Sequence, residues 1–231
     1  MRRVHCLVLL LVLVAGSALA YTVRVHLPDQ HDPWAPLSID HPNGLVTEWK
    51  LRGLAERPDE CFAVLEASDL DYERLDDHET GPGCGFFDAG RLLRSNVSWG
   101  GQVTLTCSAL VALARWERHA LQPLARELFD QDLVRIRHYG TYSCRNINGK
   151  RTGRRSEHAT ANAIDVAAFV LEDGREIRVA EHWGQAGPPG RYLEGARDRA
   201  CDLFRTVLGP EYNAAHHDHF HIDMGSYSIC R

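Results

Sequence analysis

The spacing of hydrophobic residues along the chain predicts two long helices and one short one. Apolar residues recur every three to four positions over residues 108–129, which predicts a helix, and Pro123 is expected to break or kink it. A second long helix is expected over residues 191–208, where the Gly-Pro pair that begins at Gly209 ends it. A short helix is expected over residues 60–67.

Alternating apolar and polar positions, and runs of β-branched residues, predict the strands. The predicted strands cover residues 102–106, 133–139, 141–144, 163–171, 176–180 and 218–224. Asp173-Gly174 forms a turn that joins 163–171 to 176–180 as a hairpin, whereas residues 68–90 are rich in Asp and Gly and are expected to form a loop. Helices and hairpin-linked strands are interspersed without a strand–helix–strand rhythm. The expected fold class is therefore α+β, with an antiparallel sheet flanked by helices.

The first 20 residues have the composition of a secretory signal peptide. Arg2 and Arg3 precede an apolar run over residues 6–15, and small residues precede a cleavage point after Ala20. The run of about ten residues is too short to cross a bilayer of about 30 Å as a helix. We expect a mature chain that starts near Tyr21 and does not stay inserted in a membrane.

Three segments are expected: the signal peptide 1–20, an extended arm 21–58 and a domain 59–231. The arm has an irregular pattern punctuated by four prolines, and its apolar residues argue against a disordered tail. Removal of the signal peptide, which carries two arginines and no acid, changes the formal net charge from −5 to −7. This charge argues against a nucleic-acid-binding protein. We expect the mature protein to be a monomer.

Six cysteines remain after processing, and an even number in a secreted chain predicts three disulfides. They are Cys61, Cys84, Cys107, Cys144, Cys201 and Cys230. No two of them form a C-x2-C pair, which disfavours zinc binding by thiolates. Fifteen pairings are possible, and the short separation favours Cys61 with Cys84 as one of them.

Four histidines lie within six positions, from His216 to His221. Imidazole is the commonest metal ligand and a natural general base near neutral pH. On a strand, His219, His221 and Asp223 would share one face while the apolar residues between them enter the core. One face could then carry a metal ligand and a base side by side. Alternatively, the histidine-rich run is a solvated loop that binds metal adventitiously.

A second polar segment places His158 on a loop and Asp165 within the apolar strand 163–171. A buried carboxylate needs a partner, because an unpaired buried charge is very costly. A metal ion would supply that partner, and hydrogen bonds from the backbone are the alternative. Three ligands from the two polar segments would leave one tetrahedral position for water, which is the pattern of a catalytic zinc site.

The two segments resemble the zinc peptidases of the lysostaphin, D-Ala-D-Ala peptidase and hedgehog superfamily, whose pattern is S-x-H-x-x-G-x-A-x-D followed by H-x-H. The matching residues are Ser156, His158, Ala163 and Asp165, then His219-Phe220-His221, with Ala161 in place of the glycine. Within this superfamily the chain most resembles the bacterial extensin-like C-terminal domain family, over residues 61–231. This likeness rests on Tyr142-Ser143-Cys144-Arg145, Ser156-Glu157-His158-Ala159, Asn213 with His216, Asp218-His219-Phe220-His221 and Cys230-Arg231.

The resemblance implies a D-Ala-D-Ala peptidase-like or hedgehog-like fold whose zinc ion is bound by His158, Asp165 and His221. It implies that His219 is the general base or contacts the transition state, and that His216 is a further active-site histidine. Arg145 resembles an arginine that binds the carbonyl or carboxylate of the substrate, although it is also free to pair with an acid of the chain.

The expected function is that of a zinc-dependent peptidase of the periplasm or cell envelope, acting on peptidoglycan stem peptides or their cross-links. One alternative is a zinc-containing binding or scaffolding domain without turnover, and another is a disulfide-rich domain without metal. Asp218 is expected on the strand face opposite His219, so the pattern does not predict a contact between them. Asp223 is expected either beside the metal or in a salt bridge.

Overall fold

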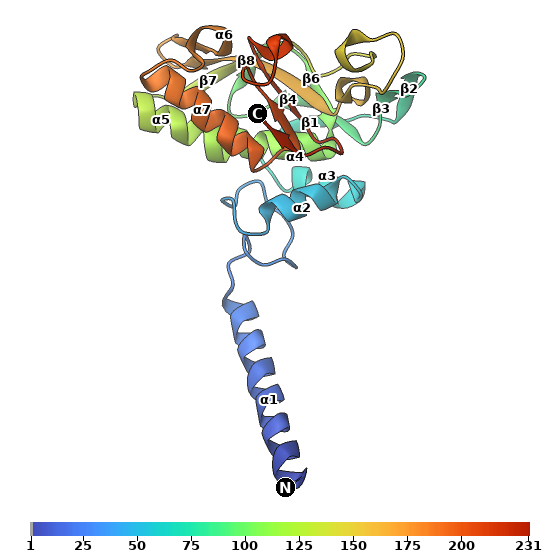
Figure 1. The fold of residues 1–231 in the computed structure, drawn as a ribbon, viewed down its shortest axis with the longest axis vertical. Coiled ribbons are helices and arrows are strands. Elements are labelled where there is room, and N and C mark those ends of the chain that lie inside the picture. The colour runs from blue at the N-terminus through green and yellow to red at the C-terminus, as the bar shows by residue number, and fades with distance from the viewer. Residues whose placement is uncertain (1) are drawn as a thin grey trace.

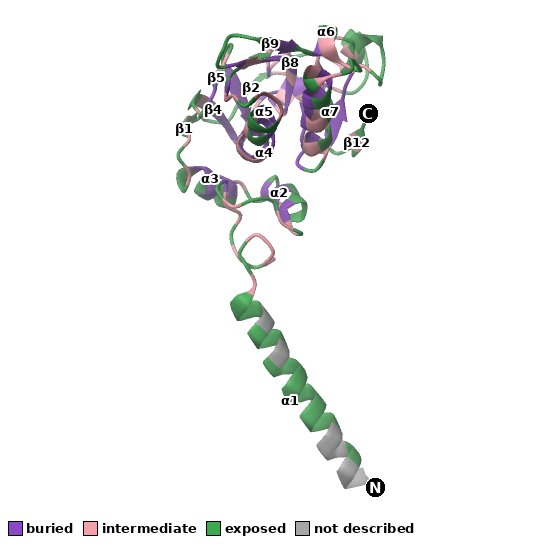
Figure 2. Ribbon diagram, turned by 90° about the vertical axis from the view of Figure 1, so that its left-hand side faces the viewer, coloured by how far each residue is buried: buried purple, intermediate pink, exposed green. Residues whose placement is uncertain are grey.

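The structure, a computed structural model, describes residues 2–231 except for the side chains of residues 2–4, 6–8, 19 and 23, which include the charged start of the predicted signal peptide. Helix α1 (Arg2–His26) stands apart from the rest of the chain, and its described side chains are exposed (Figures 1 and 2). In the described chain it is the one helix long and apolar enough to cross a membrane, a test that a signal sequence also passes. The expectation that this segment is too short to span does not hold for the whole helix, because residues 16–26 continue it.

The segment 21–58 is not extended throughout, because it contains the helix α2 (Thr47–Leu54). Leu51 and Leu54 of this helix are buried in the hydrophobic core. The fully buried Arg115 on α4 also holds this segment, because its guanidinium donates to the backbone oxygen of Ser38 and to Asn43 Oδ1. The segment therefore packs against the rest of the protein.

The longer helices lie together on one side of the main sheet (Figure 1), and they are α4 (Cys107–Trp116), the π-helical turn η1 (Glu117–Leu121), α5 (Gln122–Phe129) and α7 (Pro188–Cys201). Helix α3 (Pro58–Glu66) packs against α4, and the short helix α6 (Val179–His182) contacts α7. The predicted helix 108–129 is interrupted just before Pro123, as expected, because the π-helical turn η1 separates α4 from α5 and Pro123 lies in the first turn of α5. The predicted helix 191–208 is too long, since α7 ends at Cys201 and Thr206–Leu208 forms a strand.

Among the described residues, a seven-stranded sheet has the order β12-β10-β11-β8-β7-β5, with β9 paired to β8. These strands are β5 (Ser98–Trp99), β7 (Leu133–His138), β8 (Ala163–Leu171), β9 (Glu176–Arg178), β10 (Thr206–Leu208), β11 (Phe220–Asp223) and β12 (Ile229–Cys230). Most pairs are antiparallel, and β5–β7 and β10–β12 are parallel. The predicted α+β class and the hairpin at Asp173-Gly174 are confirmed.

The predicted loop 68–90 instead forms short hairpins. Its strands are β1 (Asp71–Arg74), β2 (His78–Gly81), β3 (Cys84–Phe86) and the start of β4 (Ala89–Arg94), and β4 also pairs with β6 (Val103–Thr106). The strand predicted at 141–144 is absent from the described structure. There the backbone turns, with Arg145 N donating to Ser143 O at 2.8 Å, and Ser143 N donates to His158 O at 3.0 Å.

Three disulfides are present, as the cysteine count predicts, and they link Cys61–Cys107, Cys84–Cys144 and Cys201–Cys230. The expected pairing of Cys61 with Cys84 is wrong, because Cys61 on α3 packs against the start of α4. Disulfides persist in oxidising compartments, so they indicate an extracytoplasmic location, and α1 is compatible with a signal sequence.

A buried acid on the π-helical turn gives the stability of the fold a pH dependence. Burial raises the pKa of Glu117 to about 7, although hydrogen bonds from Ser95 Oγ at 2.7 Å and Asn96 N at 3.0 Å act to lower it. Between the unfolded value near 4.5 and this folded value, the folded state holds the extra proton. The contribution of this group to stability is therefore complete below about pH 4.5 and is lost as the pH rises through 7.

We expect the Glu117→Gln variant to remove this pH dependence, because an amide can accept from Asn96 N and donate to Ser95 Oγ without titrating. Wild type should lose up to about 3 kcal/mol of unfolding free energy, relative to the variant, between pH 4.5 and 7.5. Denaturant unfolding at the two pH values measures this difference. The exposed Glu127→Gln is the matched control, and equal pH dependence in wild type and Glu117→Gln would contradict the assignment.

Candidate metal centre

Strand pairing brings two of the predicted ligands together. Asp165 on β8 and His221 on β11 are directly opposite each other in an antiparallel pair, so their side chains lie on the same face of the sheet. The other face of these strands carries apolar residues such as Val166 and Phe220, which are buried in the core. Alternation along the two strands therefore separates the polar centre from the core.

The third predicted ligand, His158, lies on the 3₁₀ turn η3 (Glu157–Thr160), which precedes β8. His158 on this turn is almost fully buried. Ala161 follows with φ 53° and ψ 34°, a left-handed conformation that is costly for a residue with a Cβ. A glycine at this position would adopt the conformation without that cost.

His158 Nε2, His221 Nδ1 and Asp165 Oδ1 form a closed triangle. The two nitrogens are 3.1 Å apart, and they lie 3.1 Å and 2.9 Å from the carboxylate oxygen, respectively. An N–H group points at one acceptor only, so three mutual contacts are a poor arrangement for hydrogen bonds. Tetrahedral zinc, with bonds of about 2.0–2.2 Å, places its ligand atoms roughly 3.3–3.5 Å apart. The three donor atoms lie slightly closer together than this and could hold one small cation.

The outward-facing nitrogens of both histidines contact acceptors. His158 Nδ1 is 3.3 Å from the backbone oxygen of Thr141, and His221 Nε2 is 3.0 Å from Asp223 Oδ2. If these nitrogens carry the ring protons, the nitrogens in the triangle present lone pairs. Metal-binding histidines are oriented in this way by an outer carboxylate or carbonyl. Asp223 was expected either beside the metal or in a salt bridge, and the structure shows it paired with His221.

The charges of the centre are strongly coupled. Burial acts to raise the pKa of Asp165, but hydrogen bonds from His158 and His221 hold it well below its usual range. Burial likewise acts to lower the pKa of His221, yet the carboxylates of Asp165 and Asp223 outweigh it and raise this pKa to about 9. Asp165 is thus an ionised carboxylate beside the imidazolium of His221, which is the charged partner that its burial requires.

His219 lies beside the triangle and is held by a short chain of hydrogen bonds. Its Nδ1 is 2.9 Å from Asp218 Oδ1, and Tyr139 donates to the other oxygen of Asp218 at 3.0 Å. Its Nε2 lies 3.6 Å from Asp165 Oδ1. The expectation that Asp218 and His219 lie on opposite strand faces is wrong, because both residues precede β11 and strand alternation does not apply to them.

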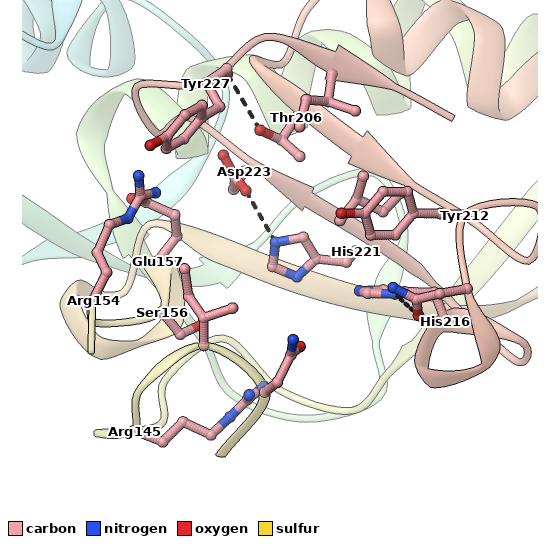
Figure 3. Close-up of a pocket in the computed structure, with 15 residues that line it drawn as sticks. Arg145, Arg154, Ser156, Glu157, Thr206, Tyr212, His216, His221, Asp223 and Tyr227 are labelled. Atoms are coloured by element: carbon pink, nitrogen blue, oxygen red, sulfur yellow. Dashed lines mark hydrogen bonds and ion pairs between the residues drawn. The ribbon is translucent and has the colours of Figure 1, made fainter. Parts of the chain in front are cut away.

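A groove of about 200 Å³ opens next to the centre (Figure 3). Its lining includes His216 and Tyr212 on one side and Arg145 and Arg154 on the other, with His221 between them in the view of Figure 3. Burial, together with the neighbouring histidines, lowers the pKa of His216 to about 4, so its imidazole is neutral at pH 7. Its Nδ1 is 2.9 Å from Asn213 Oδ1.

The structure places the six residues singled out in the sequence as follows. His158, Asp165 and His221 converge, with donor atoms within 4.8 Å of one another. His216 lies over the rings of His219 and His221, at centroid distances of 5.3 Å and 5.8 Å. Arg145 reaches the groove wall and does not touch the triangle.

Sequence patterns missed the residues that support the centre from other elements. Tyr139 and Thr141 follow β7, and Tyr212 and Tyr227 line the groove. A regular spacing pattern could not find them, because each lies in a turn or loop. Two further aromatic residues pack away from the groove: Trp183 contacts Phe220, with ring centroids 5.4 Å apart, and Tyr142 contacts Phe86 at 4.5 Å.

Fold and centre together define a disulfide-linked α+β protein with a buried histidine–aspartate cluster at the edge of a groove. The chain matches the family described as "Extensin-like protein C-terminus" over residues 59–231 and belongs to that family. No curated protein and no solved structure matches the chain.

Proposed function

We propose that this protein is a zinc-dependent peptidase of the periplasm or cell envelope that acts on peptidoglycan stem peptides or their cross-links. The proposal rests chiefly on the triangle of His158, Asp165 and His221, with the outer nitrogen of each histidine facing an oxygen acceptor. The motif resemblance to the lysostaphin, D-Ala-D-Ala peptidase and hedgehog superfamily supports the same three ligands.

A zinc ion bound by these residues would act as a Lewis acid that acidifies water and polarises a scissile carbonyl. His219 is placed to move the proton, because Asp218 fixes its Nδ1 and leaves Nε2 towards the centre. His216, held neutral with its Nδ1–H donated to Asn213 Oδ1, has only the lone pair of Nε2 left, so it would act on a substrate as a hydrogen-bond or proton acceptor. Arg145 provides a planar fork for a substrate carbonyl or carboxylate.

The arrangement around His219 favours catalysis over a purely structural zinc site. A structural site needs ligands and their supporting hydrogen bonds only. Here the Tyr139–Asp218–His219 chain holds an additional imidazole whose Nε2 is 3.6 Å from the ligand atom of Asp165, and a groove opens beside it. A binding or scaffolding domain would not require that imidazole.

The proposal is tested by digestion of purified peptidoglycan with the mature protein. We expect about one zinc per chain by elemental analysis, and release of peptide fragments that stops with a chelator and returns when zinc is added. Zinc binding without fragment release, together with pull-down onto insoluble wall material, would favour a scaffolding role. A chain that binds no zinc would refute both.

We expect Asp223→Asn to weaken zinc binding by about 10- to 100-fold. The two oxygens of Asp223 serve different donors, since Oδ2 faces His221 Nε2 and Oδ1 accepts from Gly225 N at 2.8 Å. Asparagine has one oxygen, so one N–H would face another donor or His221 would change tautomer. Competition with a chromophoric chelator measures the affinity. Asp198→Asn, on the exposed surface of α7, is the control, and unchanged affinity in Asp223→Asn would contradict the role.

A further inference from the structure

One loop beside the groove concentrates positive charge in an otherwise acidic protein. Residues 145–155 read Arg-Asn-Ile-Asn-Gly-Lys-Arg-Thr-Gly-Arg-Arg, with five cations and no acid, whereas the formal net charge of the whole chain is −5. We call this segment the basic loop. A local excess of one sign at the edge of a groove attracts ligands of the opposite charge.

The basic loop has a defined shape and a fixed position. Its two ends are paired, since Ser156 N donates to Arg145 O at 3.0 Å and Ile147 N donates to Arg154 O at 3.0 Å. Asn148 and Gly149 both have positive φ, at 56° and 66°, and lie in the short 3₁₀ turn Ile147–Gly149.

Two anchors hold the base of the basic loop. The Cys84–Cys144 disulfide adjoins Arg145, and Arg155 donates to the backbone oxygen of Pro82 through Nε at 3.0 Å and Nη2 at 2.6 Å. The loop is therefore tied to the β2–β3 hairpin, and its cations are carried at a set place beside the groove.

The cations of the basic loop differ in the contacts that they make with the rest of the protein. The guanidinium of Arg155 is engaged in its hydrogen bonds to Pro82. The guanidinium of Arg154 lies over the ring of Tyr227, and its Nη2 is 3.2 Å from Glu157 Oε1. Arg145, Lys150 and Arg151 are exposed and form no ion pair with an acid of the described chain. Arg145 and Arg154 line the groove itself (Figure 3). The exposed cations continue the charge from the groove wall to the loop tip.

We propose that the basic loop selects acidic peptides, so that the groove prefers a peptide with free carboxylates on side chains next to the cleaved bond over the same peptide with those carboxylates amidated. This inference rests on the proposed peptidase function and adds a substrate class to it. In this arrangement Lys150 and Arg151 at the loop tip pair with the side-chain carboxylates of the peptide. Arg145 then binds the carbonyl or carboxylate of the peptide that lies nearest the metal centre. Guanidinium and ammonium groups pair with carboxylates through charge-assisted hydrogen bonds.

The test compares two synthetic probes, the stem pentapeptide L-Ala-γ-D-Glu-meso-diaminopimelate-D-Ala-D-Ala and the same peptide with both side carboxylates amidated. Affinities are measured by calorimetry at low salt on the mature His219→Ala protein, so that turnover does not interfere. We expect the free form to bind about two- to thirtyfold more tightly, from two exposed ion pairs of about 0.2–1 kcal/mol each. The preference should shrink as salt is added.

The double variant Lys150→Gln/Arg151→Gln should lose most of this preference. The matched control is Arg135→Gln/Arg191→Gln, which removes the same charge from exposed positions outside the basic loop and should keep the preference. Equal affinity of wild type for the two probes, or equal effects of the two double variants, would overturn the inference.

The inference and the proposed function fail separately. If the free peptide binds preferentially through Lys150 and Arg151 but the protein with an intact His219 never cleaves it, the inference stands and the peptidase proposal fails. If both probes are cleaved and bound equally, the peptidase proposal stands and the inference fails.

Discussion

Replacement of Asp165 by asparagine is expected to abolish zinc binding and peptide cleavage together. Asp165 supplies the one anionic donor of the triangle, and its Oδ1 is 3.1 Å from His158 Nε2 and 2.9 Å from His221 Nδ1. An asparagine keeps the shape but removes the charge that balances a divalent cation. The loss of affinity should exceed the roughly 10- to 100-fold expected when only an outer partner such as Asp223 is changed.

Zinc content after dialysis and chelator competition measure the effect of Asp165→Asn. Asp130→Asn is the matched control, because Asp130 is an exposed residue in the left-handed conformation, which asparagine tolerates well. Near-ultraviolet circular dichroism shows whether the three disulfide-linked segments keep their packing. Full zinc occupancy in a folded Asp165→Asn protein would show that the carboxylate is not a ligand.

The sequence predicts those features of the centre that depend on local alternation of apolar and polar residues and on short motifs. Asp165 lies within a nine-residue apolar strand and His221 within an alternating one, so each could be placed on a strand from its neighbours alone. Their pairing opposite each other depends on the contact between β8 and β11, which no local pattern records. The resemblance to zinc peptidases implied that the two residues bind the same ion, but not that their strands pair.

The short hairpins at 68–90 could not be predicted, because their residues are mostly exposed and carry little apolar alternation. β1 and β2 each contain mainly exposed side chains. Their pairing depends on partners elsewhere, namely β4 for β1 and the disulfide from Cys84 to Cys144 for the β2–β3 hairpin. Tertiary context therefore overrides the loop composition.

The end of α7 was predicted wrongly for a related reason. A short apolar run such as 203–208 fits a buried helix or a buried strand equally well from periodicity alone. In the structure β10 pairs with β11 on one side and β12 on the other, and Cys201–Cys230 links the end of α7 to β12. Because of these long-range partners, residues 206–208 form a strand and not the last turn of a helix.

Replacement of His219 by alanine is expected to lower the turnover number for peptide cleavage by about 10²- to 10⁴-fold, the usual contribution of a general acid or base. Zinc content should stay at the wild-type level, because His219 is outside the triangle of His158, Asp165 and His221. Asp218→Asn should give a smaller loss, since it removes the charge that orients His219 but leaves the imidazole in place.

His217→Ala is the control for His219→Ala, because His217 is a neighbouring histidine with its side chain 71% exposed. The decisive comparison is turnover against zinc content in the same preparations. A ligand variant loses both, whereas loss of a proton-transfer residue lowers turnover with the metal retained. If His219→Ala keeps full turnover, the proton must move through another group, and His216, 5.3 Å away between ring centroids, is then the residue to replace. If His219→Ala loses zinc as well, His219 contributes to metal binding, and the division into three ligands and one base is wrong.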